Sequence, residues 1–592
     1  MSSLHYLLRK IREYNPFMLW MMLFSTVVGG IYPFLWVLVP AKLLSYLSTH
    51  ETQKILMLLL PTGALALLFS FLRSYLQGNY RMRMNKVRYF LIRDLIEKNL
   101  TMDYEKTLNP KELEKLERAS TTVMDPTMGA GGIMLTLLTM LGKIVAVLGF
   151  LGLFARFSPL FMLLVFVLVL FTFLLSQRAN QEEKQIWEES SPFYRRSHVL
   201  VDYVREPANG KDLRLYGFYP LLQSYFFDFR ESIYQVMKSG KRRIRRLEQI
   251  RGILDGMRDG LLYGWLVYSF YQGKLDLSSF YLYTSGLLGF VILFQEMMGD
   301  ITKIKTEGKK FQEYIHVFSE NEEEKKTDFL LSSTEGLEVE FRDVSFRYPG
   351  AIKDLFTDLS FTFRSGEKIG LVGENGSGKT TLVLLLCGFY RPTKGEILFD
   401  GKSVNLLSKR ERMFLFSVIF QDAKLFPFSI RENISFERSP DEKKLKRVEE
   451  EAGFHYFLEK IPEGDKRSLL RILDDQGIDL SGGERQKMLL ARALYKDKSR
   501  FLILDEPTAA LDALAESALY EDYAKLSEKQ TSLFISHRLA STQFCDRILY
   551  FCEGKIVEEG NHEELMKKKG HYYDLFEIQA KHYRESDHEN TD

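Results

Sequence analysis

One stretch of sequence, Gly373-Glu374-Asn375-Gly376-Ser377-Gly378-Lys379-Thr380, decides the fold of the second half of this chain. It follows a strand-like run at 368–372 and precedes a helix-like run at 382–386. A G-x-x-x-x-G-K-[ST] loop between a strand and a helix is typical of proteins that bind a nucleoside triphosphate. Its glycines let backbone N–H groups converge on phosphate oxygens, and the helix N-terminus adds partial positive charge. The stretch therefore predicts a phosphate-binding loop rather than a glycine-rich turn without a ligand.

The residues of this loop have distinct expected roles. Lys379 is expected to reach the β- and γ-phosphates, and the Thr380 hydroxyl is expected to bind Mg²⁺. The predicted cofactor-binding residues of the loop are Gly373, Asn375, Gly376, Ser377, Gly378, Lys379, Thr380 and Thr381.

Length and composition indicate more than one domain. At 592 residues the chain exceeds the size of a typical single domain. Its 46% apolar content is close to that of globular proteins, but the long uncharged runs lie mainly in the first half. A net charge of +2 argues against a nucleic-acid partner. The three cysteines, Cys387, Cys545 and Cys552, follow no metal-ligand spacing and suggest no disulfide framework.

Five apolar runs in the first half are long enough, or nearly so, to cross a bilayer as helices, which takes about 20 residues. They lie at 17–39, 55–72, 129–154 (interrupted by Lys143), 158–176 and 277–295. A shorter run at 260–273 reaches full length only with residues 253–254, and otherwise suits a buried soluble helix. Counting it predicts a transmembrane domain of six helices at 16–318.

Positive charge predicts the orientation of these spans. Lys and Arg concentrate in the loops at 73–125 and 178–258, whereas the other connections are short and poor in positive charge. Because cytoplasmic loops carry the excess of Lys and Arg, both termini are expected on the cytoplasmic side. The two long loops show helical periodicity and are expected to project out of the membrane.

Two features of the first half have two interpretations each. Residues 1–15 place Leu and Ile on one helical face and basic residues on the other, which suits an interfacial amphipathic helix or a frayed terminus. Lys143 stands inside a span, where charge is costly. It could face a substrate cavity, or it could contact backbone carbonyls or a partner helix.

The second half reads as an α/β domain at 337–580, after a charged linker at 319–336 and before a polar, disordered tail at 581–592. The apolar runs at 501–504 and 531–535 are expected as buried strands, whose carboxyl ends form the ligand-binding edge of such sheets. Asp505 follows the first run and is expected to hold Mg²⁺, and Glu506 is expected to polarise the attacking water.

The segment Leu480-Ser481-Gly482-Gly483-Glu484-Arg485-Gln486 resembles the LSGGQ signature of the ATP-binding-cassette (ABC) family. This resemblance implies that Ser481, Gly482 and Gly483 bind a second phosphate face. It also implies adenine stacking for Tyr348, Mg²⁺ sensing for Gln421, γ-phosphate contact for His537 and an interface loop at Asp512. Glu484 in place of the usual Gln, Ala509 in place of a common Ser, and 474–477 in place of Gly-Glu-x-Gly depart from the family pattern.

The resemblance covers nearly the whole chain and is to exporter-type half-transporters. It implies a multidomain membrane protein, with an all-α transmembrane domain of six helices followed by an α/β P-loop nucleotide-binding domain. In this family two nucleotide-binding domains enclose two ATP molecules, so the chain is expected to pair with a second half-transporter. All the motifs are present, which favours a homodimer, and a heterodimer with a degenerate partner stays open. Coupling helices are expected near 103–105 and 215–218.

The implied activity is ATP-driven export of an amphipathic peptide, lipid or drug across the cytoplasmic membrane, with ATP and Mg²⁺ as cofactors. The residues around the signature resemble those of bacterial exporters of lantibiotic-like peptides. Two alternatives remain, an importer of the same architecture and an ATP-gated channel or sensor. The sequence does not identify the substrate.

Overall fold

A computed structural model describes residues 3–49, 51–206, 209–319, 336–505, 523, 530–536 and 539–579. The chain divides into two compact units. Met1–Met102 and Asn109–Glu320 form the helical unit, and Asp103–Leu108 with Asn321–Asp592 forms the unit that contains the strands. The predicted linker, except for its two end residues, and the predicted disordered tail lie outside the described residues.

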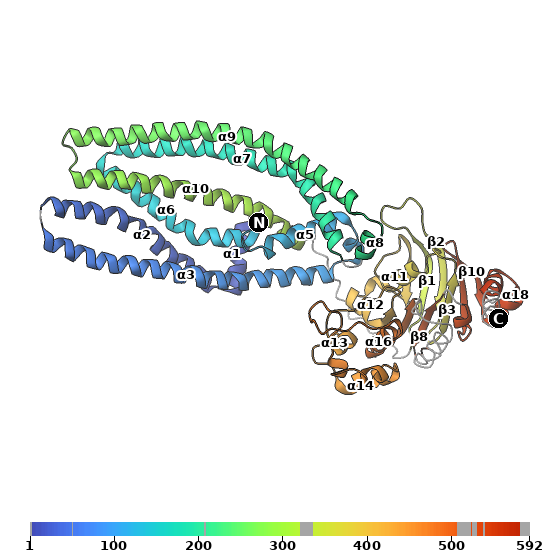
Figure 1. Cartoon of the computed structure of the whole chain (residues 1–592). Coiled ribbons are helices and arrows are strands. Elements are labelled where there is room, and N and C mark those ends of the chain that lie inside the picture. The colour runs from blue at the N-terminus through green and yellow to red at the C-terminus, as the bar shows by residue number, and fades with distance from the viewer. Residues whose placement is uncertain are drawn as a thin grey trace. The chain divides into compact units, whose positions relative to one another are not determined.

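Long helices build the helical unit (Figure 1). Neighbouring pairs in this unit are α2 with α3, α2 with α6, α6 with α10, and α7 with α9. Prolines and small polar residues between the apolar runs favour the start of a helix. At the start of α7, the Ser158 hydroxyl accepts the backbone N–H of Phe161, and Pro159 lies in the first turn. The helices are α1 (Ser3–Tyr14), α2 (Phe17–Ser48), α3 (Thr52–Thr101), α5 (Pro110–Met124), α6 (Gly129–Phe157), α7 (Pro159–Arg205), α8 (Gly210–Leu215), α9 (Tyr219–Tyr271) and α10 (Leu277–Ser319).

Within the described residues, five helical segments are long and apolar enough to cross a membrane. They correspond to the five long runs of the sequence and lie in α2, α3, α6, α7 and α10. The shorter run at 260–273 forms the carboxyl end of α9, which is continuous over 53 residues and lies beside α7. A helix is therefore present where the sixth span is predicted, but its membrane crossing stays a prediction.

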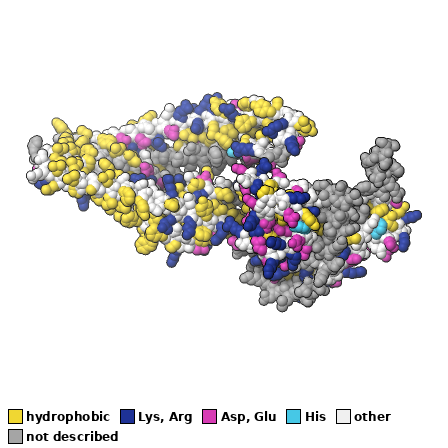
Figure 2. Space-filling view, turned by 60° about the horizontal axis from the view of Figure 1, so that its bottom comes forward, with side chains coloured by type: hydrophobic (Ala, Val, Ile, Leu, Met, Phe, Trp, Pro, Cys, Tyr) yellow, Lys and Arg dark blue, Asp and Glu magenta, His cyan; other side chains and the backbone are white. Residues whose placement is uncertain are grey.

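The helical unit exposes much apolar surface. Trp20 is 69% exposed, and Leu60 and Leu67 are each 74% exposed. Hydrophobic side chains gather on this unit in Figure 2. Contiguous apolar surface of this extent is unfavourable in water and suits contact with lipid or another protein.

Helix α1 packs its apolar face against the helical unit. Leu7 and Ile11 are fully buried, and the Tyr6 ring meets the Phe311 ring of α10 edge-on with centroids 6.0 Å apart. The Ser3 hydroxyl donates to the backbone carbonyl of Gly308, 2.6 Å away. Residues 3–14 are thus an ordered helix held by protein contacts, and their location at a membrane surface stays a prediction.

Lys143 contacts a neighbouring helix. Its Nζ lies 2.8 Å from a carboxylate oxygen of Asp300 and 3.1 Å from one of Glu296, both on α10. Lys143 and Asp300 side chains are each less than one-fifth exposed. These contacts favour the interpretation of Lys143 as a link between α6 and α10.

Two sheets form the second unit. An antiparallel sheet has the order β2-β1-β4-β5, and a larger sheet has the order β10-β9-β3-β8-β7-β6. In the larger sheet β3, β6, β7, β8 and β9 are parallel, and β10 is antiparallel to β9. The strands are β1 (Val339–Phe346), β2 (Phe356–Phe363), β3 (Lys368–Gly373), β4 (Lys394–Phe399), β5 (Lys402–Ser403), β6 (Phe416–Ile419), β7 (Phe501–Asp505), β8 (Thr531–Ile535), β9 (Arg547–Cys552) and β10 (Lys555–Gly560).

The helices of this unit surround the sheets and share their core. A continuous cluster of buried side chains joins β1–β4 to α11, including Phe341, Leu371 and Leu382. Cys387 is a core side chain, and burial raises the pKa of its thiol to about 12. The helices are α4 (Tyr104–Thr107), α11 (Lys379–Leu386), α12 (Lys409–Leu415), α13 (Ile430–Ser435), α14 (Glu442–Glu451), α15 (His455–Leu458), α16 (Gly482–Tyr495) and α18 (His562–Lys568).

The parallel strands bring the predicted site residues to one edge of the sheet. β3 ends at Gly373, β7 ends at Asp505, and β8 lies between them with Ile535 paired to Asp505. Because parallel strands share their carboxyl edge, the loop after Gly373 lies at the same edge as Asp505 and Ser536. This edge is where open α/β sheets bind ligands.

Candidate functional site

The loop predicted to hold phosphate turns sharply between β3 and α11. Gly373 ends β3 with a φ of +147°, and a Cβ there would lie 2.0 Å from the Phe551 carbonyl oxygen of β9. Only glycine fits this close approach. Gly376 and Gly378 have φ values of +79° and +107°, and α11 begins at Lys379. The loop therefore wraps over the N-terminus of α11 as the sequence predicts.

Lys379 is folded inward under the loop. The residue is 5% exposed, and its Nζ donates to the carbonyl oxygens of Gly373, 3.0 Å away, and Glu374, 2.8 Å away. A buried ammonium at a helix N-terminus makes the centre of the loop strongly electropositive. An anion such as a phosphate group complements this charge.

The burial and hydrogen bonding of two other side chains of the loop show whether it suits a phosphate. Ser377 is 6% exposed, and its buried hydroxyl oxygen has no hydrogen-bond partner among the described residues. A buried hydroxyl without a partner is costly unless a ligand supplies one, and phosphate oxygens accept such bonds. Thr380 is exposed at the start of α11, so its hydroxyl is open to a ligand. Ser377, Lys379 and Thr380 thus fit a bound nucleotide phosphate.

Tyr348 is tied to the same helix. Its phenol oxygen lies 2.6 Å from the hydroxyl oxygen of Thr381, which is buried in α11. The half-buried Tyr348 ring also packs edge-on against Phe346 and Tyr390. These contacts hold the ring beside the phosphate-binding loop, and its stacking on adenine stays a prediction.

The predicted metal-binding residues share the carboxyl edge of the sheet. Asp505 is 1% exposed at the end of β7, and Gln421 lies exposed two residues after β6, the neighbour of β7. Among the described residues, no group of three or more His, Cys, Asp or Glu side chains could hold a metal ion. The oxygens of Thr380, Gln421 and Asp505, together with phosphate oxygens, are of the kind that Mg²⁺ accepts, and the binding of Mg²⁺ by these residues stays a prediction.

Ser481 caps the helix that the signature segment opens. Its hydroxyl accepts the backbone N–H of Glu484, and a Glu484 carboxylate oxygen accepts the backbone N–H of Ser481 at 2.8 Å. This reciprocal capping box explains how Glu484 substitutes for the usual Gln, because either side chain can close it. Ser481 and Gly482 are exposed and Gly483 is half-buried, so the start of α16 is open to a ligand.

The remaining predicted residues, Glu506, His537 and the interface residue Asp512, lie outside the described residues. Glu506 directly follows Asp505 in the chain, and His537 follows Ser536 at the end of β8. Their catalytic and binding roles stay predictions.

Two arginines that the sequence interpretation missed tie the signature helix to the segment after Gln421. Arg485 donates to the carbonyl oxygen of Ala423, and Arg492 donates to the carbonyl oxygens of Lys424 and Asn433 at 3.1 and 2.8 Å. Burial lowers the pKa of Arg492 to about 10. Arg485 and Arg492 are seven residues apart and therefore lie on one face of α16. This spacing was the sequence signal that could have identified them.

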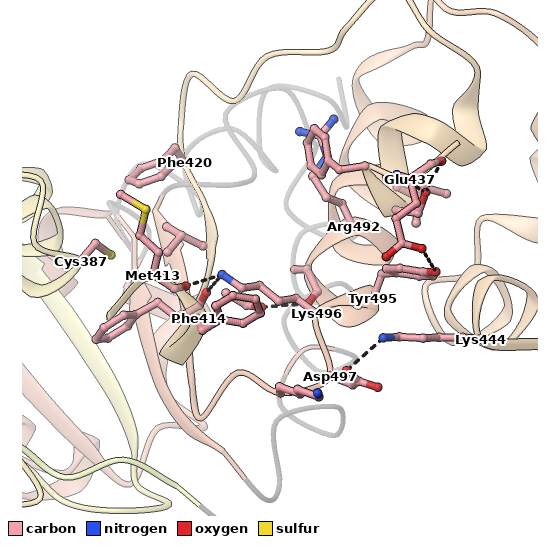
Figure 3. A pocket seen from close by; sticks show the side chains of 18 of the residues that line it. Cys387, Met413, Phe414, Phe420, Glu437, Lys444, Arg492, Tyr495, Lys496 and Asp497 are labelled. Carbon is pink, nitrogen blue, oxygen red and sulfur yellow. Dashed lines mark hydrogen bonds and ion pairs between the residues drawn. The ribbon is translucent and has the colours of Figure 1, made fainter. Parts of the chain in front are cut away.

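A basic pocket of about 730 Å³ lies beside this helix (Figure 3). Met413, Phe414 and Phe436 contribute apolar walls, and Lys444, Lys496, Lys498 and Arg492 contribute positive charge. Lys496 reaches across to the carbonyl oxygen of Phe416 at 2.6 Å, and burial lowers its pKa.

Phe389 connects this pocket to α4. It lines the basic pocket, and its ring meets the Tyr104 ring with centroids 5.1 Å apart. Lys409 pairs with Asp103 at 2.6 Å. The segment 103–108 therefore belongs to the second unit by its contacts, although its chain neighbours belong to the helical unit.

The loop, its buried lysine and the parallel sheet define a P-loop nucleotide-binding domain. Residues 356–509 match the family model described as ABC transporter. The solved structure of a bacterial Atm1-family ABC exporter with ATP bound superposes with a TM-score of 0.79 at 19% identity, covering 96% of this chain and 98% of that chain. Residues 356–509 therefore form a domain of the ABC transporter family. The chain as a whole has the exporter fold, with an ATP-binding domain after the helical region.

Curated relatives match either the ATP-binding half or nearly the whole chain. The ATP-dependent lipid A-core flippase of Burkholderia orbicola (strain AU 1054) is 41% identical over 249 residues, which are 42% of this chain and 41% of the relative. The probable multidrug resistance protein YheH of Bacillus subtilis (strain 168) is 38% identical over 41% of this chain and 35% of its own length. The subtilin transport ATP-binding protein SpaT of Bacillus subtilis is 26% identical over 92% of this chain and 88% of its own length. The match thus spans about two-fifths of the flippase and multidrug relatives.

Proposed function

We propose that this chain is one half of a dimeric membrane exporter that hydrolyses ATP to move an amphipathic substrate out of the cytoplasm. One observation carries the proposal: a single chain joins a phosphate-binding unit to a helical unit with five segments apolar enough to cross a membrane. ATP hydrolysis at the phosphate-binding unit would then drive movement of a substrate through the helical unit. The names of the relatives, which include a flippase and a subtilin transport protein, support export of amphipathic molecules.

The residues at the carboxyl edge of the larger sheet would carry the hydrolysis. Lys379 and the loop N–H groups hold the β- and γ-phosphates, and Ser377 donates its buried hydroxyl to a phosphate oxygen. Thr380, Gln421 and Asp505 would hold Mg²⁺, which would supply positive charge against the charge that develops on the phosphates. Glu506 orients and polarises the attacking water, and His537 contacts the γ-phosphate.

The ATP site would be shared between two chains. Ser481 and Gly482 are exposed at the N-terminus of α16, where backbone N–H groups favour an anion. We assign them to the ATP held by Lys379 of the partner chain, as the family resemblance implies. Since each chain carries both halves of the site, a homodimer has two complete sites. Two-fold pairing is also the commonest form of oligomer.

Coupling would pass through the segment 103–108 and through α8. Within the second unit, Tyr104 contacts Phe389 and Asp103 pairs with Lys409. Leu215 and Tyr216, at the end of α8, are 77% and 74% exposed, so this turn offers apolar surface to a nucleotide-binding unit.

The membrane placement follows from charge. Lys and Arg in the two long loops support a location of those loops and both termini in the cytoplasm. We propose six spans in the cytoplasmic membrane, and the bacterial relatives support a bacterial membrane.

The test uses vesicles that contain the purified chain. Inside-out vesicles should accumulate an amphipathic substrate when ATP is added, and Glu506→Gln vesicles should bind ATP but lose nearly all hydrolysis and accumulation. ATP-driven loss of substrate from the same vesicles would indicate import instead. Flux that persists in the Glu506→Gln variant at the wild-type rate would indicate a gated channel.

A further inference from the structure

The helix pair α5 and α6 is interrupted by a built-in break at residues 125–128. Pro126 cannot continue α5, because it lacks a backbone N–H group. Gly129, the first residue of α6, has a φ of +49°, and a Cβ there would lie 2.2 Å from the Thr122 carbonyl oxygen. Only glycine tolerates this geometry, so the local sequence specifies the break.

Two buried charges from other helices hold the helix ends at this break. Arg88 of α3 is 8% exposed and donates to the carbonyl oxygens of Val123, 3.0 Å away, and Met124 at the end of α5. Glu307 of α10 is 7% exposed, and its carboxylate accepts the backbone N–H of Gly129 at 2.6 Å.

The signs of these charges match the helix dipoles. A cation stabilises the carboxyl end of a helix, and an anion stabilises its amino end. Arg88 lies at the carboxyl end of α5 and Glu307 at the amino end of α6, so both interactions stabilise the helix ends that the break creates. Each charge also has a side-chain partner: Asn85 accepts from Arg88 at 2.8 Å, and Lys310 pairs with Glu307 at 2.8 Å.

Because of where the break lies in the chain, the contacts of Arg88 and Glu307 affect how movement passes from α5 to α6. The segment 103–108 belongs to the second unit, and α5 begins two residues after it at Pro110. A displacement of that segment therefore reaches α6 along the chain only through α5 and residues 125–128. Without the contacts of Arg88 and Glu307, the chain would bend at residues 125–128 and α6 would not follow the displacement, because a helix interruption is a common hinge.

We propose that Arg88 and Glu307 are positioning residues that make the break rigid, so that movement of α5 is transmitted to α6, α3 and α10. This inference rests on the proposed ATP-driven function, since it concerns how nucleotide binding reaches the membrane helices. It assigns the two residues a role in coupling beyond their contribution to stability.

Hydrogen exchange measured by mass spectrometry tests the inference without a known substrate. The full chain in nanodiscs of phosphatidylethanolamine and phosphatidylglycerol is compared without nucleotide and after trapping with ATP and vanadate. In the wild type, trapping should change exchange in both 110–124 and 129–140. In Glu307→Ala and Arg88→Met, we expect the change at 129–140 to fall at least about threefold while that at 110–124 stays within about twofold.

Matched variants separate coupling from stability. Lys310→Ala removes the ion pair of Glu307 but leaves its bond to Gly129, so it should respond as the wild type does. Glu307→Gln keeps an acceptor for Gly129 and should restore part of the response at 129–140.

Three results would contradict the inference. A wild-type response at 129–140 in both Glu307→Ala and Arg88→Met would overturn it, and so would equal losses in α5 and α6, which indicate general destabilisation. A wild-type chain that hydrolyses no ATP and shows no response would overturn the proposed function, and the inference with it.

Discussion

The Tyr104 ring packs edge-on against the Phe389 ring, with their centroids 5.1 Å apart. Tyr104 also meets Tyr390 at 6.0 Å, and Asp103 pairs with Lys409 at 2.6 Å. Phe389 and Tyr390 lie three and four residues after Leu386, the last residue of α11, which is the helix that begins with Lys379. The contact therefore links segment 103–108, which lies in the chain between α3 and α5 of the helical unit, to the residues that follow the phosphate-binding helix.

Removing this ring should uncouple transport from hydrolysis. An edge-on aromatic pair contributes roughly 0.5–1.5 kcal/mol beyond its buried area, which corresponds to about a two- to tenfold effect. We expect Tyr104→Ala to lower the amount of substrate moved per ATP hydrolysed by about that factor, with the hydrolysis rate retained. Transport and ATPase measured on the same vesicles give the ratio.

Two controls accompany this variant. Tyr104→Phe keeps the ring and should keep the ratio, and Tyr89→Ala removes a tyrosine that is 68% exposed on α3. An unchanged ratio in Tyr104→Ala would remove this contact from the coupling path.

Lys143 should stabilise the helical unit through its two carboxylate partners. Lys143→Met leaves Asp300 and Glu296 without their shared cation, and unpaired charges of this kind cost roughly 1–3 kcal/mol. We expect a lower apparent Tm in detergent, and recovery when Asp300→Asn and Glu296→Gln are added. Equal Tm values for Lys143→Met and the wild type, with altered substrate stimulation of the ATPase, would favour a substrate-facing role instead.

Glu449 should make stability depend on pH. It is 6% exposed on α14, and one of its oxygens has no hydrogen-bond partner among the described residues. Burial raises its pKa to about 7; Asp465 and Glu442 add to the rise, and Arg431 and Lys446 oppose it. Between pH 4.5, the ordinary pKa, and pH 7 the folded state binds more protons than the unfolded state, so stability falls as pH rises through this window.

A neutral replacement should remove this loss. Glu449→Gln should melt near the wild-type temperature at pH 5 and about 2–4 °C above it at pH 8. Glu450→Gln, which changes the exposed neighbour, should leave the difference between the two pH values unchanged. The same Tm difference between Glu449→Gln and the wild type at both pH values would exclude this titration.

Local sequence predicted the features that depend on local geometry. The loop at 373–380 was predictable because its glycines, lysine and flanking strand act within one strand–turn–helix unit. The edge shared by Asp505 and Gly373 was also predictable, since alternating strands and helices produce parallel sheets.

Long-range partners were not predictable. Asp300 and Glu296 lie more than 150 positions from Lys143, and no periodicity indicates which helix faces meet. Arg88 and Glu307 become notable only when their neighbours at the α5–α6 break are known. The tolerance of Glu484 likewise required the capping geometry of Ser481.

Mixed dimers test most directly whether the ATP site is shared between two chains. One chain carries Lys379→Ala, the other carries Ser481→Arg, and two different affinity tags isolate dimers that contain both. Every site of either mutant homodimer contains one defect. If each site pairs Lys379 of one chain with Ser481 of the other, the mixed dimer has one site with both defects and one intact site.

The mixed dimer should then hydrolyse ATP at up to about half of the wild-type rate, while both mutant homodimers stay near zero. If each site lay within one chain, both sites of the mixed dimer would be defective. A mixed dimer no more active than the two homodimers, at equal yield and Tm, would contradict the shared site.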